Sequence, residues 1–226
     1  MAADLSSAGQ ESTAGKLRIT EIFLSLQGEA AAVGWPTVFV RLTGCPLRCR
    51  YCDTDYAFTG GKSMTIDAVV AAIRQYGVNH VCVTGGEPLA QKGCLELLRR
   101  LCDADHEVSL ETSGALDICG VDERVSRVMD IKTPCSGEAA KNRYENIALL
   151  RENDQVKLVI GDRNDYEWAV AIERKYQLHE RCSVLFSPVF GSIEPRQLAE
   201  WIIADRLPVR FQLQLHKILW GDEQGR

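Results

Sequence analysis

The sequence predicts an α/β fold in which parallel strands are covered by helices, as an open sheet or curled into a partial barrel. Strand-like and helix-like segments alternate from residue 17 onward, which is typical of parallel sheets. The chain has 226 residues, whereas a complete eight-fold barrel typically takes about 250. Polar or glycine-rich residues follow four successive predicted strands, where parallel sheets usually place their sites.

The expected strands are short runs of β-branched and other apolar residues. They cover residues 17–23, 37–42, 80–83, 107–110, 128–131, 155–160, 183–186 and 209–213.

The expected helices carry apolar residues at helical spacing. Thr65 is expected to cap the first helix, and Gly77 is expected to end it. The helices cover residues 65–76, 89–103, 142–151, 165–176 and 195–205.

Composition and charge exclude several functional classes. Apolar residues make up 46% of the chain and charged residues 25%, as in ordinary globular proteins. The net charge of -5 gives no basic footprint for nucleic acid. No apolar run reaches the roughly 18 residues of a membrane span, and residues 1–16 lack the features of a signal peptide. We expect a cytoplasmic protein that binds neither membranes nor nucleic acid, with a disordered tail at residues 1–16 and one domain at 17–226.

Three of the nine cysteines, Cys45, Cys49 and Cys52, are clustered with the spacing C-x3-C-x2-C. A structural zinc ion takes four ligands, and a 4Fe-4S cluster usually takes four cysteines, but no fourth ligand lies nearby in the sequence. A 4Fe-4S cluster with one open iron is the favoured interpretation, with zinc and metal-free core cysteines as alternatives. The other six are expected to be small buried side chains: Cys82, Cys94, Cys102, Cys119, Cys135 and Cys182.

With Tyr51 directly before the third cysteine, this loop resembles the signature of the radical S-adenosylmethionine superfamily. The resemblance implies that S-adenosylmethionine binds the open iron and that its cleavage gives a deoxyadenosyl radical, which abstracts a hydrogen from the substrate. The cofactors carry this chemistry, and the protein supplies binding, orientation and electrostatics.

Three further motifs at strand ends fit the same superfamily. The stretch Thr84-Gly85-Gly86-Glu87-Pro88 resembles its Gly-Gly-Glu-Pro motif, which holds the methionine amino group, although alone it would be a common turn. Ser113 and Lys132 would contact the cofactor, although a strand end and a solvated lysine are the simpler alternatives. Tyr51 and Asp53 complete the implied cofactor-binding set, together with Gly85, Gly86 and Glu87.

The segments that flank these motifs resemble one narrower family, 7-carboxy-7-deazaguanine synthase. They are residues 21–29, 38–45, 52–55 and 213–217. The resemblance implies a carbon-nitrogen lyase that converts 6-carboxy-5,6,7,8-tetrahydropterin to 7-carboxy-7-deazaguanine, with ring contraction and release of ammonia, on the pathway to queuosine. It also implies an incomplete, TIM-like barrel, a requirement for Mg2+, a homodimer, and an external reductant such as flavodoxin or ferredoxin.

The same resemblance assigns residues to Mg2+ and to the substrate. Thr54 would bind Mg2+, which keeps several waters and takes substrate oxygens as further ligands. Arg41 would pair with the substrate carboxylate, and Gln27 and Glu29 would hydrogen-bond the pterin edge. The remaining implied substrate contacts are Leu26, Gly28, Thr84 and His216. No protein acid or base is assigned.

Three features depart from the family pattern. Ala30 stands where the family motif has glycine, residues 132–135 differ from the Ser-Pro-Lys of some members, and the chain continues past Lys217. Two rival functions stay open. One is activation of a glycyl-radical enzyme, which would need a protein-docking surface, and the other is a metal-stabilised module without catalysis.

Overall fold

The computed structural model describes residues 15–221 and 223–225. The tail predicted at residues 1–16 lies almost wholly outside the described residues, and the first strand already begins at Lys16. None of the described helices is long and apolar enough to cross a membrane.

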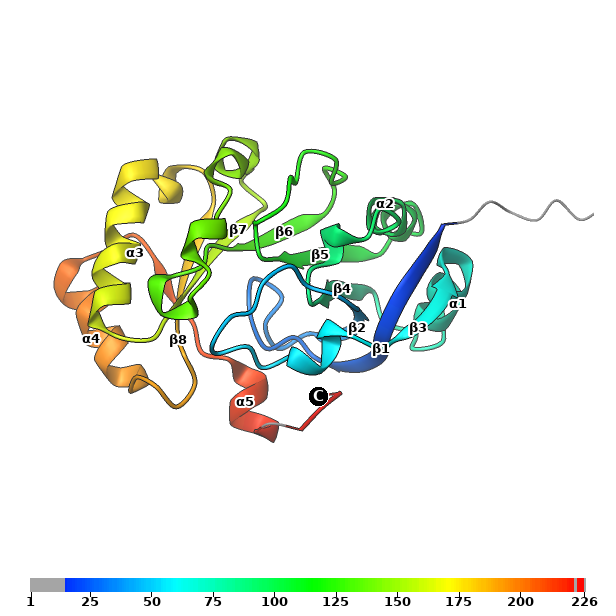
Figure 1. The fold of residues 1–226 in the computed structure, drawn as a ribbon, viewed down its shortest axis with the longest axis horizontal. Helices are drawn as coiled ribbons and strands as arrows, with labels where there is room; N and C mark the ends of the chain where they lie inside the picture. Colours follow the sequence, from blue (N-terminus) through cyan, green and yellow to red (C-terminus); the bar gives the residue numbers. More distant parts are fainter. Residues whose placement is uncertain (1–14, 222, 226) are drawn as a thin grey trace, which may run out of the picture.

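One nine-stranded sheet organises the described chain, in the order β3-β1-β2-β4-β5-β6-β7-β8-β9 (Figure 1). The strands are β1 (Lys16–Leu26), β2 (Pro36–Leu42), β3 (Lys62–Thr65), β4 (His80–Gly85), β5 (Glu107–Thr112), β6 (Ser126–Asp130), β7 (Gln155–Ile160), β8 (Ser183–Pro188) and β9 (Arg210–Phe211).

The run from β2 to β9 is parallel throughout. The two edge strands β3 and β9 do not pair with each other, so the barrel is open. The predicted partial barrel of parallel strands is therefore confirmed, with one correction. Strand β1 pairs antiparallel with both β2 and β3, because it is joined to β2 by a hairpin loop and not by a crossover helix.

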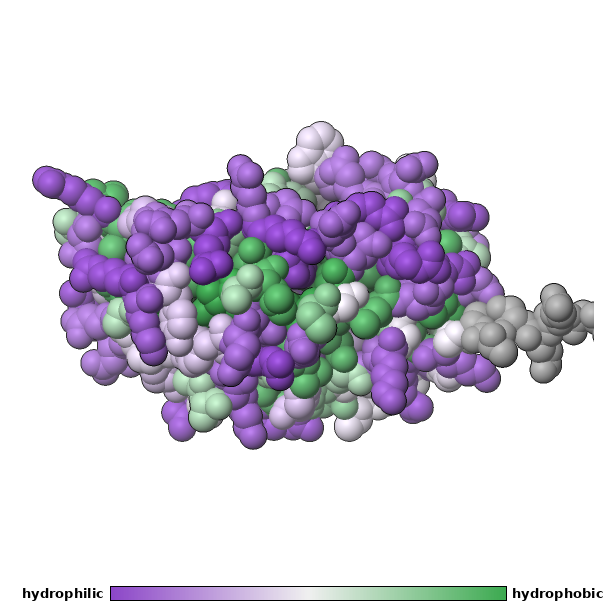
Figure 2. All heavy atoms as spheres, turned by 90° about the horizontal axis from the view of Figure 1, so that it is seen from above, coloured by the Kyte–Doolittle hydropathy of each residue, from purple (hydrophilic) through white to green (hydrophobic). Residues whose placement is uncertain are grey.

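Helices cover the outer face of the sheet, with α1 and α2 over one half and α3 and α4 over the other (Figure 1). The helices are α1 (Ile66–Arg74), α2 (Cys94–Asp103), α3 (Arg163–Tyr176), α4 (Pro195–Asp205) and α5 (Leu215–Trp220). In the turned view of Figure 2, apolar groups gather in the middle of the face and polar groups surround them.

Helix α1 shows how the local sequence sets an element. The side chain of Thr65 accepts a hydrogen bond from Ala68 N at 3.2 Å, as an N-cap should. The apolar side chains Ile66, Val69, Val70 and Ile73 are buried against the sheet. The predicted cap and apolar face are both confirmed.

The helix predicted at residues 142–151 is wrong. This stretch forms a 3-10 segment at Tyr144–Leu149 instead. The amide of Asn142 bonds the backbone of Lys132, and the amide of Asn146 bonds Gly114 O and Leu116 O. Asparagine side chains that bond to distant backbone compete with helix formation, so these contacts hold the segment in an irregular path.

Three other elements differ from expectation. Helix α2 begins at Cys94 and not at residue 89, because Pro88–Ala90 forms a separate 3-10 turn. Strand β3 and helix α5 were not predicted, and the last strand is only Arg210–Phe211. These are short elements, for which local periodicity gives little signal.

Candidate active site

A cavity of about 480 Å³ lies inside the partial barrel. Every predicted site residue except Glu87 lines it. The lining comes from the loop after β1, the cysteine loop after β2, the carboxyl ends of β4, β5 and β6, the middle of β7, and the chain end. The volume is within the roughly 300–1,000 Å³ of small-molecule sites.

The three clustered cysteines lie on one loop, and all three face this cavity. Each is partly buried, and Cys52 N donates to Cys49 O at 3.2 Å, which tightens the loop. Burial raises the pKa of the thiols of Cys45, Cys49 and Cys52. Thiols of this kind keep their protons until a metal displaces them.

The two glycines at the end of β4 let its backbone pack directly against the start of the cysteine loop. A Cβ on Gly85 would lie 2.2 Å from Leu42 O, and one on Gly86 would lie 2.3 Å from Gly44 O. The next residue, Glu87, donates its backbone N–H to Gly44 O at 2.7 Å. Close backbone approach of this kind requires glycine, so the motif fixes the cysteine loop.

The side chain of Glu87 lies behind the cavity wall and, unlike the other predicted site residues, does not line the cavity. It is fully buried, and its carboxylate accepts hydrogen bonds from Thr112 Oγ1 at 3.0 Å, Ser113 N at 2.7 Å and Ser113 Oγ at 2.5 Å. A buried carboxylate needs such donors. Here they orient Ser113, which does line the cavity.

Lys132 and Asp130 form an ion pair in the cavity wall, with Lys132 Nζ 3.0 Å from Asp130 Oδ2. Burial alone would lower the pKa of Lys132, but Asp130 raises it above its usual value. The other oxygen, Asp130 Oδ1, is buried and has no hydrogen-bond partner among the described residues. Since Asp130 faces the cavity, this oxygen suits a donor on a bound group.

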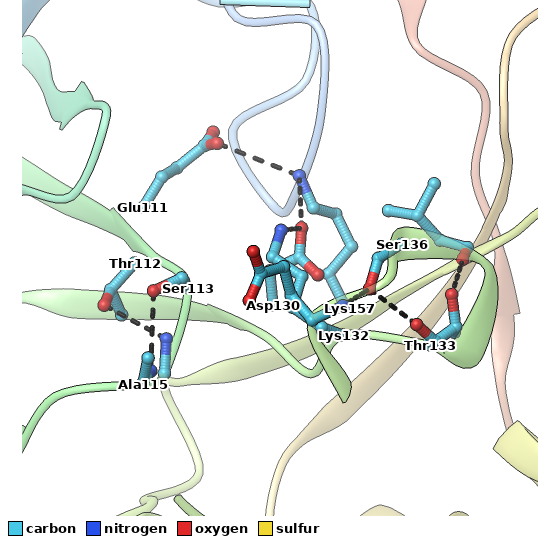
Figure 3. Close-up of polar contacts among 12 residues, drawn as sticks. Glu111, Thr112, Ser113, Ala115, Asp130, Lys132, Thr133, Ser136 and Lys157 are labelled. Atoms are coloured by element: carbon cyan, nitrogen blue, oxygen red, sulfur yellow. Dashed lines mark hydrogen bonds and ion pairs between the residues drawn. The ribbon is translucent and has the colours of Figure 1, made fainter. Parts of the chain in front are cut away.

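Lys157 is the centre of a buried charge cluster that the sequence analysis missed. Its Nζ lies 2.5 Å from Glu29 Oε2 and 3.9 Å from both Glu111 Oε2 and Asp130 Oδ2. Figure 3 shows Lys157 reaching toward Glu111 and Asp130. A lysine between Val156 and Leu158 in a predicted strand was the available signal.

The carboxylates of this cluster have opposite pKa shifts. Burial would raise the pKa of Glu29, but contact with Lys157 lowers it below its usual value. Burial raises the pKa of Glu111, which lies farther from Lys157. The pKa of Lys157 is raised because its carboxylate neighbours outweigh its burial. Two carboxyls of one cavity thus differ in how readily each holds a proton.

The loop after β1 is in direct contact with residues 214–216 near the end of the chain. Gln214 Nε2 donates to Glu29 Oε1 at 2.7 Å. A Cβ on Gly28 would lie 2.2 Å from His216 Nδ1, so only glycine leaves room for this imidazole. Burial lowers the pKa of His216. These contacts join residues that are far apart in the sequence.

Arg41 is held in place before any substrate enters. Its Nε donates to Glu21 Oε1 at 2.6 Å, and Tyr56 OH donates to the same oxygen at 2.8 Å. The guanidinium also lies 5.7 Å from the ring centroid of Phe23. The pair is partly buried, so the orientation of the fork is defined by the protein.

Thr54 and its neighbour Asp53 line the cavity next to the cysteine loop. Thr54 Oγ1 donates to Asp53 Oδ1 at 2.8 Å. Within residues 15–221 and 223–225, no three His, Cys, Asp or Glu side chains are grouped as ligands for a single metal ion. A Mg2+ ion needs fewer protein ligands than this, since it retains waters.

The sequence is similar to proteins of known family. Residues 39–133 match the model of the radical SAM superfamily. The 7-carboxy-7-deazaguanine synthase of Chlorobaculum tepidum is 47% identical and covers 94% of this chain and 98% of its own length. The synthase of Koribacter versatilis is 39% identical, covering 92% and 98%.

Solved structures agree on the fold. The crystal structure of QueE from Escherichia coli superposes with a TM-score of 0.74 at 23% identity, covering 89% of this chain and 95% of that one. Streptococcus suis SuiB bound to its precursor peptide SuiA gives 0.55 at 15% identity, covering 76% and 46%. With this fold, this cavity and relatives similar over nearly their whole length, the chain belongs to the 7-carboxy-7-deazaguanine synthase family of the radical SAM superfamily.

Proposed function

We propose that the chain is a lyase that converts 6-carboxy-5,6,7,8-tetrahydropterin to 7-carboxy-7-deazaguanine, with ring contraction and release of ammonia, in queuosine biosynthesis. The observation that carries the proposal is that one cavity is lined both by the three cysteines and by residues 27–29, Arg41 and His216. The family's name describes the same product.

The residues of the cysteine loop suit a 4Fe-4S cluster held by Cys45, Cys49 and Cys52. Three thiols on one loop face a cavity with room for a further molecule. In a 4Fe-4S cluster each cysteine binds a different iron, so the three thiols can lie farther apart than the ligands of a single metal ion. Together with S-adenosylmethionine, the bound cluster supplies the radical that removes a hydrogen atom from the substrate. The chain's own task is to hold the cluster and leave one iron open.

We assign S-adenosylmethionine to the wall formed by Tyr51, Asp53, Gly85, Gly86, Ser113 and Lys132. Ser113 presents a hydroxyl that Glu87 orients from behind, and Asp130 Oδ1 offers a buried acceptor. A cofactor with an amino group and ribose hydroxyls would satisfy these atoms. We place Glu87 in a supporting position and not in contact with the cofactor.

We assign the substrate to the region of residues 26–29, Arg41, Thr84 and His216. The guanidinium of Arg41, oriented by Glu21, suits the substrate carboxylate. Glu29 and Gln27 offer an anionic acceptor and an amide to the pterin edge. Thr54, beside Asp53, would hold Mg2+ near the substrate carboxylate and neutralise its charge.

The assembly and the reductant follow from the family alone. We propose a homodimer, an external flavodoxin or ferredoxin as electron donor, and a cytoplasmic location. All nine cysteines are free, which suits a reducing compartment. Neither rival function is favoured. The synthase relatives match over nearly their whole length, and a cavity of about 480 Å³ suits a small molecule better than a protein segment.

An anaerobic assay tests the proposal. Reconstituted protein is incubated with dithionite, S-adenosylmethionine, Mg2+ and 6-carboxy-5,6,7,8-tetrahydropterin, and the products are identified by mass spectrometry. We expect 7-carboxy-7-deazaguanine and ammonia. If deoxyadenosine forms without 7-carboxy-7-deazaguanine, the radical chemistry is supported and the substrate assignment is overturned. If protein shown to hold its iron forms neither product, the enzyme assignment is overturned.

A further inference from the structure

A terminal segment, residues 212–216, lies along the substrate loop, residues 27–30. Successive contacts join the two stretches. Leu215 N donates to Gly28 O at 3.0 Å, and the His216 ring fills the space beside Gly28. The terminal segment therefore supports the conformation of the substrate loop.

Gln212 binds both backbone polar groups of Ala30. Gln212 Oε1 accepts from Ala30 N at 2.6 Å, and Gln212 Nε2 donates to Ala30 O at 3.1 Å. Gln212 is itself buried, and its backbone N donates to Phe186 O of β8 at 3.0 Å. The sheet thus fixes Gln212, and Gln212 fixes Ala30.

Ala30 adopts a backbone conformation that alanine rarely takes. Its φ of 63° lies in the left-handed region, where the Cβ crowds the following carbonyl oxygen. Ala30 is buried and packs with Val128 and Leu185, so water cannot readily replace the bonds to its backbone. Glycine would adopt this conformation without cost, but alanine needs support from its surroundings.

The bond to Ala30 N acts on the residue beside it. This N–H belongs to the peptide unit that joins Glu29 to Ala30, so the bond fixes the plane next to the Glu29 Cα. The Glu29 carboxylate lies between Lys157 Nζ at 2.5 Å and Gln214 Nε2 at 2.7 Å. A rotated peptide would move the carboxylate away from both partners.

We infer that Gln212 is a positioning residue for substrate binding, because it clamps Ala30 in the left-handed conformation and so places the carboxylate of Glu29. The inference rests on the proposed function, which assigns the substrate loop to the pterin. Gln212 does not line the cavity, so its effect reaches the substrate through the loop.

The first test is Gln212→Ala in the reconstituted holoenzyme. We expect the KM for the pterin to rise about tenfold, equivalent to about 1.4 kcal/mol, with a much smaller change in kcat. Cleavage of S-adenosylmethionine without pterin should stay at the wild-type rate, because the cysteine loop is not involved. Hydrogen exchange read by mass spectrometry should show faster exchange in the peptide that covers residues 27–30.

The second test adds Ala30→Gly to Gln212→Ala. Since glycine needs no clamp to reach a positive φ, this change should recover most of the lost pterin affinity. Arg206→Gly is the matched control, because Arg206 also has a positive φ, 51°, but lies at the end of α4 and outside the cavity. It relieves the same backbone strain and should leave the KM of the Gln212→Ala variant unchanged.

A conservative variant keeps the test decisive if Gln212→Ala does not fold. Gln212→Met keeps the length and volume of the buried side chain and loses both hydrogen bonds to Ala30, and we expect a rise in KM of the same kind and size. Wild-type KM and wild-type exchange in a folded Gln212 variant would overturn the inference. Equal recovery by Arg206→Gly would also overturn it, since the loss would then be global.

The two levels of proposal fail in different ways. If the wild-type holoenzyme does not turn over the pterin, the proposed function fails, and the positioning of a substrate contact fails with it. In that case, the exchange data still report whether Gln212 holds the loop. If the wild type turns over normally and the variants bind the pterin as well as it does, only the inference fails.

Discussion

Two regions of the cavity are built in different ways. The proposed cofactor region, residues 45–53, 85–87 and 112–113, comes from short contiguous motifs that are joined largely by backbone hydrogen bonds and close glycine contacts. In the proposed substrate region, residues 27–30, 111, 157 and 212–216, single bonds join side chains to groups 128 and 182 positions away.

This difference in construction matches the different tasks proposed for the two regions, which are the radical reaction and the recognition of the substrate. A cofactor site that depends on backbone geometry can be encoded in a few adjacent residues, since turns and glycines set that geometry locally. A substrate site made of buried charges depends on partners that only the folded sheet brings together. Changes in the cofactor region should therefore abolish the radical reaction, whereas changes in the substrate region should alter stability, pH dependence and affinity.

The largest effect is expected for Cys49→Ala. Loss of one of three ligands should remove most of the iron and abolish cleavage of S-adenosylmethionine, as measured by iron analysis and deoxyadenosine formation. Cys119→Ala is the control, because Cys119 is exposed and outside the cavity. Full activity of Cys49→Ala would contradict the assignment of the cysteine loop to the cluster.

The next effect is expected for Lys157→Met in the substrate region. The variant would leave Glu29, Glu111 and Asp130 buried without their shared cation. Removing one partner from a buried ion cluster costs about 3–5 kcal/mol. Urea unfolding of the anaerobic holoenzyme should show a loss of this size. The exposed residue Lys62 provides the control, since Lys62→Met should change the free energy of unfolding by less than about 0.5 kcal/mol.

A smaller, pH-dependent effect is expected for Glu29→Gln. Lys157 lowers the pKa of Glu29 against the effect of burial, while Glu111 and His216 also face it. Glu29 therefore stabilises the fold above its unfolded pKa, near 4.5, and this contribution is lost as pH falls through the folded pKa. Glu29→Gln should lower the free energy of unfolding by about 1–2 kcal/mol at neutral pH and by less near pH 4.

Glu111→Gln should show the opposite slope. Burial raises the pKa of Glu111, with Lys157, Glu29, Arg41 and Asp130 as its charged neighbours. Its ionisation therefore costs the folded state increasingly as pH rises above the unfolded pKa. Relative to the wild type, the variant should gain stability as pH rises above about 4.5. Parallel slopes for the two variants would contradict the opposite shifts.

The smallest effect is expected for Thr54→Ala, which removes one hydroxyl from the proposed Mg2+ site. Product formation should require a several-fold higher Mg2+ concentration, with unchanged iron content, because Mg2+ draws most of its ligands from water and substrate. Thr59→Ala, exposed and outside the cavity, is the control. An unchanged Mg2+ response would remove Thr54 from the site.

Strong local patterns predicted most of the fold. The strand at residues 155–160 and the helix at 195–205 have the predicted bounds, because one is rich in valine, leucine and isoleucine and the other begins with proline at its first turn. The helix at 142–151 failed because two asparagine amides bond to distant backbone. Helix α5 is too short for periodicity to identify it.

The sequence by itself determined the motifs of the proposed cofactor region. Cysteine spacing, two adjacent glycines and polar residues at successive strand ends are properties of neighbouring residues, so they can be read before folding is known. The alternation of strands and helices then placed these residues at one edge of the sheet, where the cavity lies.

Only the tertiary structure decided how the substrate region is held. The pairing of Lys157 with Glu29, of Arg41 with Glu21 and of Gln212 with Ala30, like the inward turn of Glu87, depends on strand register and on which face of a strand points inward. The physical reason is that a buried charge or strained backbone is stable only beside a suitable partner, and the folded barrel brings those partners together from distant parts of the chain.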